Sequence, residues 1–313
     1  MDTKEKLLKI YNISEQFFED ADISWEDLET IYNDFSDKAK KKYAQILKSF
    51  EEEYLQDLSK MGIHSYRTRI KDPEHLVIKI IRKRKENYKK YKKLAKDNYE
   101  MFLTDLIGIR CFVLFKEQWK DFHSYITTQF ENDVQYYVRD SIKDFDSNDS
   151  HNYIAEPPKA HIRNGDSRKI YENILQPECI LSDKIYRSVH YIIKYKGVYL
   201  EIQVRTLFEE GWGEVEHSLI YPYYQEDETL NEYSELLNRL TGLADEMGSF
   251  FGKLRQIRIQ NGNDGTVQKQ TEEKDSKHYS EVQSELPEDY GDSEKTESRN
   301  DTPESCLNEV LKE

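Results

Sequence analysis

The 313-residue sequence has few cysteines and no long apolar run. Its three cysteines, Cys111, Cys179 and Cys306, are too few and too scattered for a disulfide framework. No stretch approaches the roughly 20 consecutive apolar residues of a membrane-spanning helix. The N-terminus also lacks the apolar core of a signal peptide. We therefore expect a soluble, cytoplasmic protein without membrane contact, built as one large domain or two small ones.

Several well-known catalytic motifs are also missing. The sequence contains no Walker A glycine loop, no G-x-G-x-x-G segment, no zinc-ligand spacing and no G-x-S-x-G elbow. The segment Glu214-Val215-Glu216-His217 lacks the second histidine of a zinc-binding helix. We therefore expect a capping or core role for His217.

The charges are distributed unevenly. The net charge is −15, yet residues 264–313 alone contain 15 Asp and Glu, 6 Lys and Arg, and only six Leu, Ile, Val or Phe. Such a segment buries too little apolar surface to offset its chain entropy, so we predict a disordered acidic tail. Residues 67–96 show the reverse bias, with 13 Lys and Arg. This basic block indicates an anionic ligand, although a solvated helix face gives the same pattern.

Apolar spacing predicts the main elements. Residues 1–60 have helical periodicity, and Asp72-Pro73-Glu74 has the residue types of a helix start. The nearly continuous apolar run over 106–115 predicts a buried central strand. We expect a helix over 118–130 and mostly loop, with at most a short strand, over 151–183. A last helix should end near residue 260.

Residues 186–205 have the clearest pattern in the chain. Two alternating runs flank Lys196-Gly197, which suits a two-residue hairpin turn. One face of this hairpin is apolar. The other face carries Ser188, His190, Lys194, Glu201, Gln203 and Arg205. A buried sheet face this polar requires a ligand or solvent, so we predict a site there.

Two sites before the hairpin carry candidate residues, the first for binding phosphate and the second for binding a metal. The basic loop Arg67-Thr68-Arg69-Ile70-Lys71 comes just before a predicted helix N-terminus, where cations and free N–H groups together bind anions. Surface charge is the alternative. Asp105 stands at the start of the central strand, where a carboxylate can hold a divalent metal or act as a helix cap.

Two candidates belong to the hairpin itself. Glu201 projects from the polar face and could orient or deprotonate a hydroxyl, or simply pair with Arg205 or Lys194. Tyr186 stands at the entrance of the hairpin, where its ring could stack on a base or pack in the core.

The order of four segments resembles the RelA/SpoT synthetase domain, and more closely the small stand-alone alarmone synthetases. These segments are TRIKDPEHLVIKIIRKR, DLIGIRC, YRSVHYIIKYKGVYLEIQVRT and WGEVEHSLIYPYY. The resemblance runs from about His64 to Tyr224. It implies an α+β, nucleotidyltransferase-like fold with a mixed, roughly five-stranded β-sheet flanked by helices. Around this fold we expect helical N- and C-terminal extensions. The chain then divides into an N-terminal helical region over 1–60, the synthetase-like domain with C-terminal helices over 61–260, and a disordered acidic tail over 261–313.

The resemblance also implies an activity. Family members act as GTP diphosphokinases: with Mg²⁺ they transfer a pyrophosphate from ATP to the 3′-hydroxyl of GTP or GDP, making (p)ppGpp and releasing AMP. On the matching positions, the ATP phosphates would be held by Arg67, Arg69, Lys71 and Lys79. Asp105 and Glu201 would bind the metal, and Glu201 would activate or orient the acceptor hydroxyl. Tyr186 would stack on the acceptor guanine, with His190 and Gln203 nearby.

The sequence departs from the family pattern mainly on the acceptor side. Ile185 replaces a glycine before Tyr186, and the asparagine that helps read guanine has no counterpart. His75 replaces a serine after the basic loop. An alternative acceptor is therefore the 3′ end of tRNA, as in toxin-type relatives, with the basic helix over 82–96 contacting RNA phosphates. A third alternative is a catalytically silent nucleotide-binding module with a regulatory role. The resemblance further implies a homo-oligomer, a tetramer, and no (p)ppGpp hydrolase domain.

Overall fold

A computed structural model describes residues 3–133, 151–220 and 227–261, and the structural statements below concern these residues. The described residues up to Gln256 belong to one compact unit. The predicted acidic tail lies outside the described residues. No helix in the described ranges is both long and apolar enough to cross a membrane.

The N-terminal region is helical, as predicted. It contains α1 (Lys4–Ile10), α2 (Glu15–Asp20), α3 (Trp25–Lys38), the π-helix η1 (Ala39–Tyr43), α4 (Ala44–Tyr54) and α5 (Leu58–Met61). Ser14, Ser24 and Asp57 each accept a hydrogen bond from a backbone N–H of the helix that follows. Such caps satisfy N–H groups that have no partner inside the helix, so the sequence itself sets these helix starts.

A mixed sheet of seven strands forms the centre of this unit. Its strands are β1 (Ser65–Ile70), β2 (Ile107–Val113), β3 (Tyr153–Ile154), β4 (Lys159–Arg163), β5 (Ile180–Lys184), β6 (Ser188–Tyr195) and β7 (Val198–Thr206). The order is β1-β2-β7-β6-β4-β5, and β3 also pairs with β6. The pairs β2–β7 and β4–β5 are parallel and the others antiparallel. This confirms the predicted α+β class with a mixed sheet flanked by helices.

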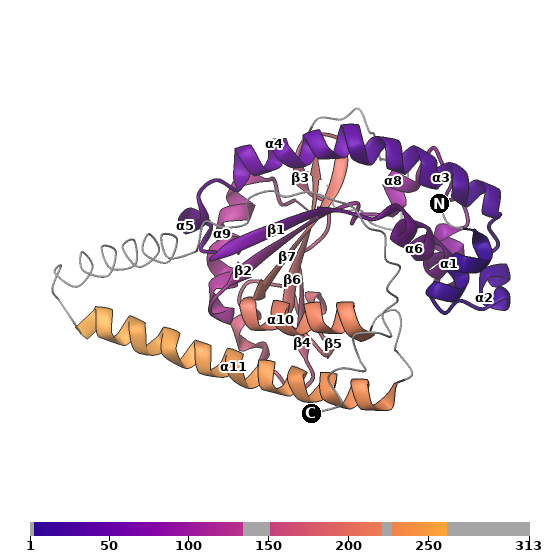
Figure 1. Cartoon of the computed structure of the whole chain (residues 1–313). Coiled ribbons are helices and arrows are strands. Elements are labelled where there is room, and N and C mark those ends of the chain that lie inside the picture. The colour runs from indigo at the N-terminus through magenta and orange to yellow at the C-terminus, as the bar shows by residue number, and fades with distance from the viewer. Residues whose placement is uncertain (1–2, 134–150, 221–226, 262–313) are drawn as a thin grey trace, which may run out of the picture. The chain divides into compact units, whose positions relative to one another are not determined.

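Helices cover both faces of this sheet (Figure 1). After β1 come α6 (Pro73–Glu86), α7 (Tyr88–Tyr91) and α8 (Tyr99–Phe102), and after β2 come η2 (Lys116–Gln118) and α9 (Trp119–Gln129). The C-terminal elements are α10 (Leu207–Val215), the π-helix η7 (Glu216–Ile220) and α11 (Glu228–Asn261). Asp72 caps α6 by accepting from the N–H groups of Glu74 and His75 at 2.8 and 3.0 Å, so the predicted helix start is confirmed. The predicted helices over 118–130 and up to about 260 are confirmed by α9 and α11.

The hairpin was predicted with the correct register. Ile192 pairs with Glu201 and His190 pairs with Gln203. Lys196 and Gly197 both have positive φ, 48° and 76°, as a type I′ turn requires. The apolar face packs against α4 and α9, where the ring of Tyr195 lies 5.2 Å from that of Phe50.

Two expectations about local structure were wrong. Residues 151–183 contain more than the one short strand expected, because they form β3, β4 and most of β5, with the 3₁₀ turns η5 (Arg168–Ile170) and η6 (Pro177–Cys179) in the connections. These strands have two to five residues, so pairing stabilises them more than any pattern of their own: β3 and β4 pair with β6, and β5 pairs with β4. They also raise the implied strand number from about five to seven. The basic segment before α6 is the edge strand β1 rather than a loop, since it pairs with β2.

Candidate active site

The polar residues of four strands share one face of the sheet. One cross-strand row consists of Arg67 on β1, Arg110 on β2, Gln203 on β7 and His190 on β6. Directly paired residues project to the same side of a sheet, so these side chains lie on a common face. The predicted polar face of the hairpin therefore continues across β2 to the edge strand.

The neighbouring row on this face contains Arg69, Gly108 and Glu201. A Cβ atom at Gly108 would lie 3.3 Å from Nε of Arg69. Glycine at this position therefore leaves room for the Arg69 side chain to lie over β2 on the face that also carries Glu201.

A pocket of about 720 Å³ opens where β1 and α6 meet this face, and we call it the basic pocket. It is lined by Arg67, Thr68, Arg69, Lys71, Asp72, His75, Ile78, Lys79, Arg82, Lys83, Glu86, Asp105, Arg110, Glu214, His217 and Ser218. Seven of these side chains are Lys or Arg and four are Asp or Glu, which leaves an excess of three positive charges. The four residues predicted to bind ATP, and Asp105, all line it.

Asp105 lies between two lysines of this pocket. Its Oδ2 is 2.9 Å from Nζ of Lys71 and 2.5 Å from Nζ of Lys79. Burial alone would raise the pKa of Asp105, but the charges and hydrogen bonds of Lys79 and Lys71 outweigh burial and lower the pKa to about 2. Its other oxygen, Oδ1, is buried and has no hydrogen-bond partner among the described residues. Asp105 is thus an ionised carboxylate with one oxygen available to a ligand.

Lys71 lies close to other cations of the basic pocket. Burial lowers the pKa of Lys71, and the like charges of Lys79 and Arg69 act in the same direction. The carboxylate of Asp105 raises the pKa of Lys71, but not by enough to offset burial and these like charges together. An anionic ligand would therefore be stabilised here by several cations at once.

Glu201 is held by two neighbours on the hairpin. Its Oε1 lies 3.3 Å from Nδ1 of His190, and Nε2 of Gln203 donates to its Oε2 at 3.0 Å. Burial would raise the pKa of Glu201, but the hydrogen bond and charge of His190 lower the pKa below its ordinary value. The carboxylate is therefore ionised at neutral pH and can accept a proton. Its observed partners differ from Arg205 and Lys194, which the sequence suggested.

Tyr186 lies beside two histidines. Its ring is 5.7 Å from that of His161 and 6.4 Å from that of His190, and the second pair is close to parallel at 28°. The Tyr186 ring is partly exposed and does not belong to the buried core. Nε2 of His190 is buried and has no hydrogen-bond partner in the part of the chain that the structure describes. We call Tyr186, His161, His190, Glu201 and Gln203 the hairpin cluster.

A chain of contacts joins the hairpin cluster to the basic pocket. Arg205 donates to Gln203 and pairs with Glu210 at 3.2 Å. Arg110 then pairs with Glu210 at 2.8 Å and with Glu214 at 2.5 Å. Glu214 also contacts Arg67 at 2.9 Å. The residues of this chain alternate in charge from the hairpin to the edge strand, which fixes α10 against the polar face of the sheet.

Sequence reasoning missed several residues of this site, and Arg110 is the most central of them. Arg110 stands inside an apolar run. It lies two residues after Gly108, so both project to the same side of β2, and the pairing of β2 with β7 places Glu201 on that side as well. The parallel pairing joins segments about 90 residues apart, and no local pattern signals it. Of the two roles expected for His217, the core role was wrong. It is exposed and lines the basic pocket.

The site fits a divalent metal only if a ligand completes the coordination. No group of three or more His, Cys, Asp and Glu side chains suited to a metal ion occurs in the described residues. Asp105 and Glu201 influence each other electrostatically, and Asp105 offers its unpartnered Oδ1. Mg²⁺ is typically bound by one or two carboxylates together with substrate phosphates, and these two carboxylates fit that pattern.

A pocket rich in cations next to two ionised carboxylates has the chemistry that phosphate-bearing ligands require. Consistent with this, residues 68–226 match the family described as "Region found in RelA / SpoT proteins". This match covers half of the chain, and the protein belongs to this family. The resemblance found in the sequence is thereby confirmed.

Solved structures of low sequence identity also resemble the chain. A Streptococcus mutans protein is 21% identical, with 74% of this chain and 94% of that chain covered and a TM-score of 0.40. A GTP pyrophosphokinase family protein from Streptococcus pneumoniae is 19% identical, with 75% and 98% covered and a TM-score of 0.41. Small alarmone synthetase 1 from Bacillus subtilis, bound to its product pppGpp, is 20% identical, with 76% and 98% covered and a TM-score of 0.39. No curated protein matches the sequence.

Proposed function

We propose that the protein is a pyrophosphokinase that transfers the β,γ-pyrophosphate of ATP to the 3′-hydroxyl of GTP or GDP. The product is (p)ppGpp, and AMP is released. The observation that carries the proposal is Asp105, ionised between Lys71 and Lys79 in a pocket with excess positive charge, next to the sheet face that presents Glu201. Membership in the RelA/SpoT family supports the same activity.

In this proposal the basic pocket holds ATP. Arg67, Arg69, Lys71 and Lys79 neutralise its phosphates. Transfer of a phosphoryl group depends mainly on positioning and on charge neutralisation, and clustered cations supply both. Mg²⁺, when held by Asp105 and Glu201, would add to this charge neutralisation.

The hairpin cluster would hold the acceptor. The Tyr186 ring stacks on the guanine, and His190 and Gln203 keep the carboxylate of Glu201 in place. Glu201 orients the 3′-hydroxyl or accepts its proton. The hydroxyl oxygen forms a bond to the β-phosphorus of ATP, and the bond between that phosphorus and the α,β-bridging oxygen breaks, so AMP leaves with the bond electrons.

A second candidate acceptor, the 3′ end of tRNA, is favoured by the surface next to the basic pocket. Arg82 and Lys83 line the pocket, and the exposed side chains of Lys89, Lys90 and Lys92 continue the positive charge along the chain beyond α6. A row of cations next to a phosphate site is suited to a nucleic-acid backbone.

The test is a transfer assay with purified protein, Mg²⁺ and γ-labelled ATP, in parallel with GTP, GDP or deacylated tRNA. Label in a guanosine nucleotide supports the proposal, and label in tRNA supports the second candidate. Label in none of the acceptors, together with retained ATP binding, would identify a catalytically silent nucleotide-binding module. The matched negative control is Glu201→Gln, which keeps the size of the side chain and removes its charge.

A further inference from the structure

Charged side chains attach the long helix α11 to the sheet. Asp245 of α11 accepts hydrogen bonds from Nη1 of Arg187 and Oγ1 of Thr206, both at 2.6 Å. Arg163, on β4, donates through Nε to Oδ1 of Asn238 of α11 at 3.3 Å. None of these residues lines the basic pocket. The contact between α11 and the sheet is therefore a second group of charged residues, which the proposed reaction does not use.

The same residues reach α10, the helix beside α11 (Figure 1). Thr206 is the N-cap residue of α10, and its hydroxyl oxygen accepts from the N–H of Glu209 at 3.2 Å. The proton of this hydroxyl is donated to Asp245. Nη1 of Arg163 donates to Oε1 of Glu209. The start of α10 and the middle of α11 are thus joined through one hydroxyl group and one guanidinium group.

The group contains more carboxylates than guanidinium groups. We call Arg163, Asp166, Arg187, Glu209 and Asp245 the charge cluster, in which Asp166 pairs with Arg187 at 2.9 Å. Two positive charges therefore face three carboxyl groups. The side chains of Glu209 and Asp245 are only 1% and 0% exposed. An ionised carboxylate without a compensating charge is costly at such a place, so one of the three carboxyl groups should hold a proton.

Other charged and titratable groups near the charge cluster do not supply the missing positive charge. Among the described residues they are two pairs of opposite charge and one phenol, namely Arg205 with Glu210, Lys116 with Glu246, and Tyr171. Burial raises the pKa of Tyr171, so its hydroxyl is neutral. Glu246 also lies 3.5 Å from Nη2 of Arg187, which adds negative charge and not positive charge.

The hydrogen bonds identify Glu209 as the group that holds the proton. Both oxygens of Asp245 accept from a donor, and Oδ2 of Asp166 accepts from Nε of Arg187 at 3.0 Å. Oε2 of Glu209 is buried and has no hydrogen-bond partner in the described part of the chain. Burial and the charge of Asp245 raise the pKa of Glu209 to about 7, although the two arginines act in the opposite direction.

We propose that Glu209 holds one proton at the junction of α10, α11 and β4, and that loss of this proton loosens the attachment of α11 to the sheet. With the proton bound, two guanidinium groups balance two carboxylates, and the charge cluster is neutral. Without the proton, an ionised Glu209 on α10 faces an ionised Asp245 on α11 in a buried place. The two like charges then repel each other across the contact between these helices.

The first test measures the stability of the full-length protein by urea unfolding at pH 6, 7 and 8. The unfolded chain releases the proton of Glu209 near the ordinary pKa of 4.5, whereas the fold keeps it up to about pH 7. Stability should therefore fall as the pH rises from about 4.5 to 7 and then level off. Relative to Glu209→Gln, which stays neutral, the folding equilibrium constant of the wild type should fall about tenfold between pH 6 and pH 8.

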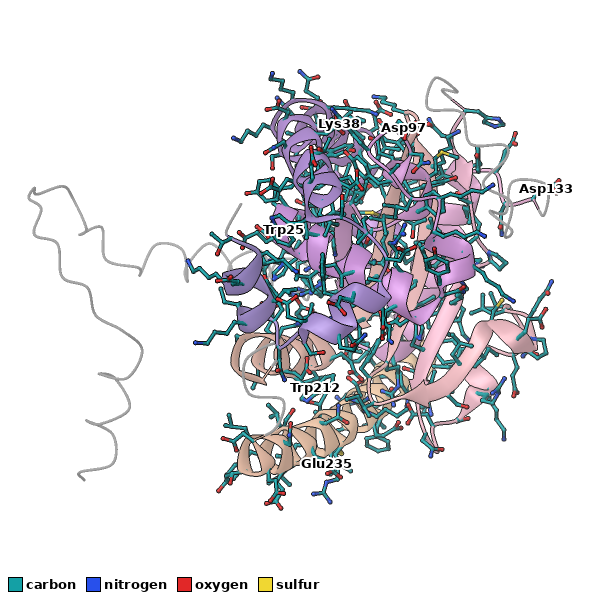
Figure 2. All side chains as sticks on the ribbon, turned by 90° about the vertical axis from the view of Figure 1, so that its right-hand side faces the viewer. Trp25, Lys38, Asp97, Asp133, Trp212 and Glu235 are labelled. Carbon is teal, nitrogen blue, oxygen red and sulfur yellow. The ribbon has the colours of Figure 1, made fainter. Side chains whose placement is uncertain are left out.

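The matched control for this test is Glu235→Gln, an exposed carboxylate of the same helix that Figure 2 labels. The stability of this variant relative to the wild type should not change between pH 6 and pH 8. An equal pH dependence of the wild type and Glu209→Gln would overturn the proposal.

The second test asks whether the proton acts on α11 itself. Hydrogen exchange of α11 is compared between the wild type and Glu209→Gln at the same pH, so that the intrinsic effect of pH on exchange cancels. From pH 6 to pH 8 the ratio of the two rates should rise about tenfold for α11. For α1, which contains no residue of the charge cluster, the ratio should stay constant. A constant ratio for α11 would contradict a loosened attachment.

A second variant keeps the proposal testable if Glu209→Gln does not fold. Asp245→Asn removes the negative charge that faces Glu209, so Glu209 should lose its proton at a lower pH. The tenfold fall of the folding equilibrium constant should then move below pH 6. An Asp245→Asn protein that keeps the wild-type fall between pH 6 and pH 8 would refute the role of the charge cluster. None of these measurements uses a substrate, so their outcome is independent of the proposed function.

Discussion

The basic pocket and the hairpin cluster lie on the same face of one sheet but differ in how their charges are compensated. In the basic pocket seven cations face four carboxylates, and burial and like charge lower the pKa of Lys71. In the hairpin cluster, Glu201 has both His190 and Gln203 as partners.

In the proposed reaction, this difference separates ATP binding in the basic pocket from the chemical step at the hairpin cluster. An excess of positive charge attracts a polyanion whatever the details of its structure, since several cations contribute together. A single carboxylate with two fixed neighbours attracts little by itself, but it is held in a defined position with a defined charge. We therefore expect changes in the basic pocket to act on ATP binding, and changes in the hairpin cluster to act on turnover.

The largest effect is expected for Glu201→Gln. Loss of the carboxylate removes the group proposed to orient or deprotonate the acceptor hydroxyl, so the transfer rate should fall by about 10²–10⁴-fold. ATP affinity measured without Mg²⁺ should stay unchanged, because Glu201 does not line the basic pocket. Initial rates and equilibrium titration with ATP measure the two quantities. The control is Glu178→Gln at an exposed position, and a Glu201→Gln enzyme with full activity would refute the mechanism.

The next effect is expected for Arg69→Ala in the basic pocket. The Arg69 side chain is exposed, so its loss should leave the stability of the fold nearly unchanged. A hydrogen bond to a charged group contributes about 1.5–3 kcal/mol, so ATP affinity should fall about 10- to 100-fold. Arg255→Ala, an exposed arginine of α11, is the matched control. If Arg69→Ala lowered the maximal rate and left ATP affinity intact, the separation of binding from chemistry would be wrong.

The ionised Asp105 predicts a dependence of stability on pH. Because its pKa is about 2 in the fold against an ordinary 3.8, Asp105 stabilises the protein by about 2 kcal/mol at neutral pH. This contribution is present above pH 4 and is lost as the pH falls toward 2. Urea unfolding of wild type and Asp105→Asn at several pH values measures it.

The wild type should therefore be more stable than Asp105→Asn at pH 7, and the difference should shrink below pH 4. Asp97→Asn, at an exposed position labelled in Figure 2, is the control and should show a small difference throughout. A difference for Asp105→Asn that does not change with pH would contradict the pairing with Lys71 and Lys79.

The smallest effect is expected for Gly108→Ala. The new Cβ would lie 3.3 Å from Nε of Arg69, so this side chain has to shift by a few tenths of an ångström. The KM for ATP should rise slightly, with no change in the maximal rate. Gly211→Ala, where a Cβ meets no atom within 4 Å, is the control. An equal effect of both variants would mean that the Arg69 side chain does not need the space that glycine leaves at position 108.

Some elements of the site could be predicted because their signals are local. The turn at Lys196-Gly197 fixes the hairpin register, and with it the common face of His190, Glu201 and Gln203. The cap at Asp72 and the proline after it fix the start of α6. Each signal lies within a few residues of what it determines, so one sequence is enough to read it.

Other elements could not be predicted because distant segments create them. The strand β5 is stabilised by pairing with β4, and β4 by pairing with β6 as well. Arg110 becomes part of the site when β2 pairs with β7, and Glu214 joins it when α10 packs on the sheet. The leucines of α11 predicted a helix correctly, but not that the polar side of this helix would face the sheet.

The sequence by itself determined the helix starts, the hairpin and the residue types of the site, because caps, turns and alternation act over a few bonds. Only the tertiary structure decided that Asp105 lies between Lys71 and Lys79, that Arg110 bridges to α10, and that α11 exposes apolar side chains such as Leu240 and Leu243. Those outcomes depend on which segments pack together, and the free energy of that packing is shared among residues far apart in the chain.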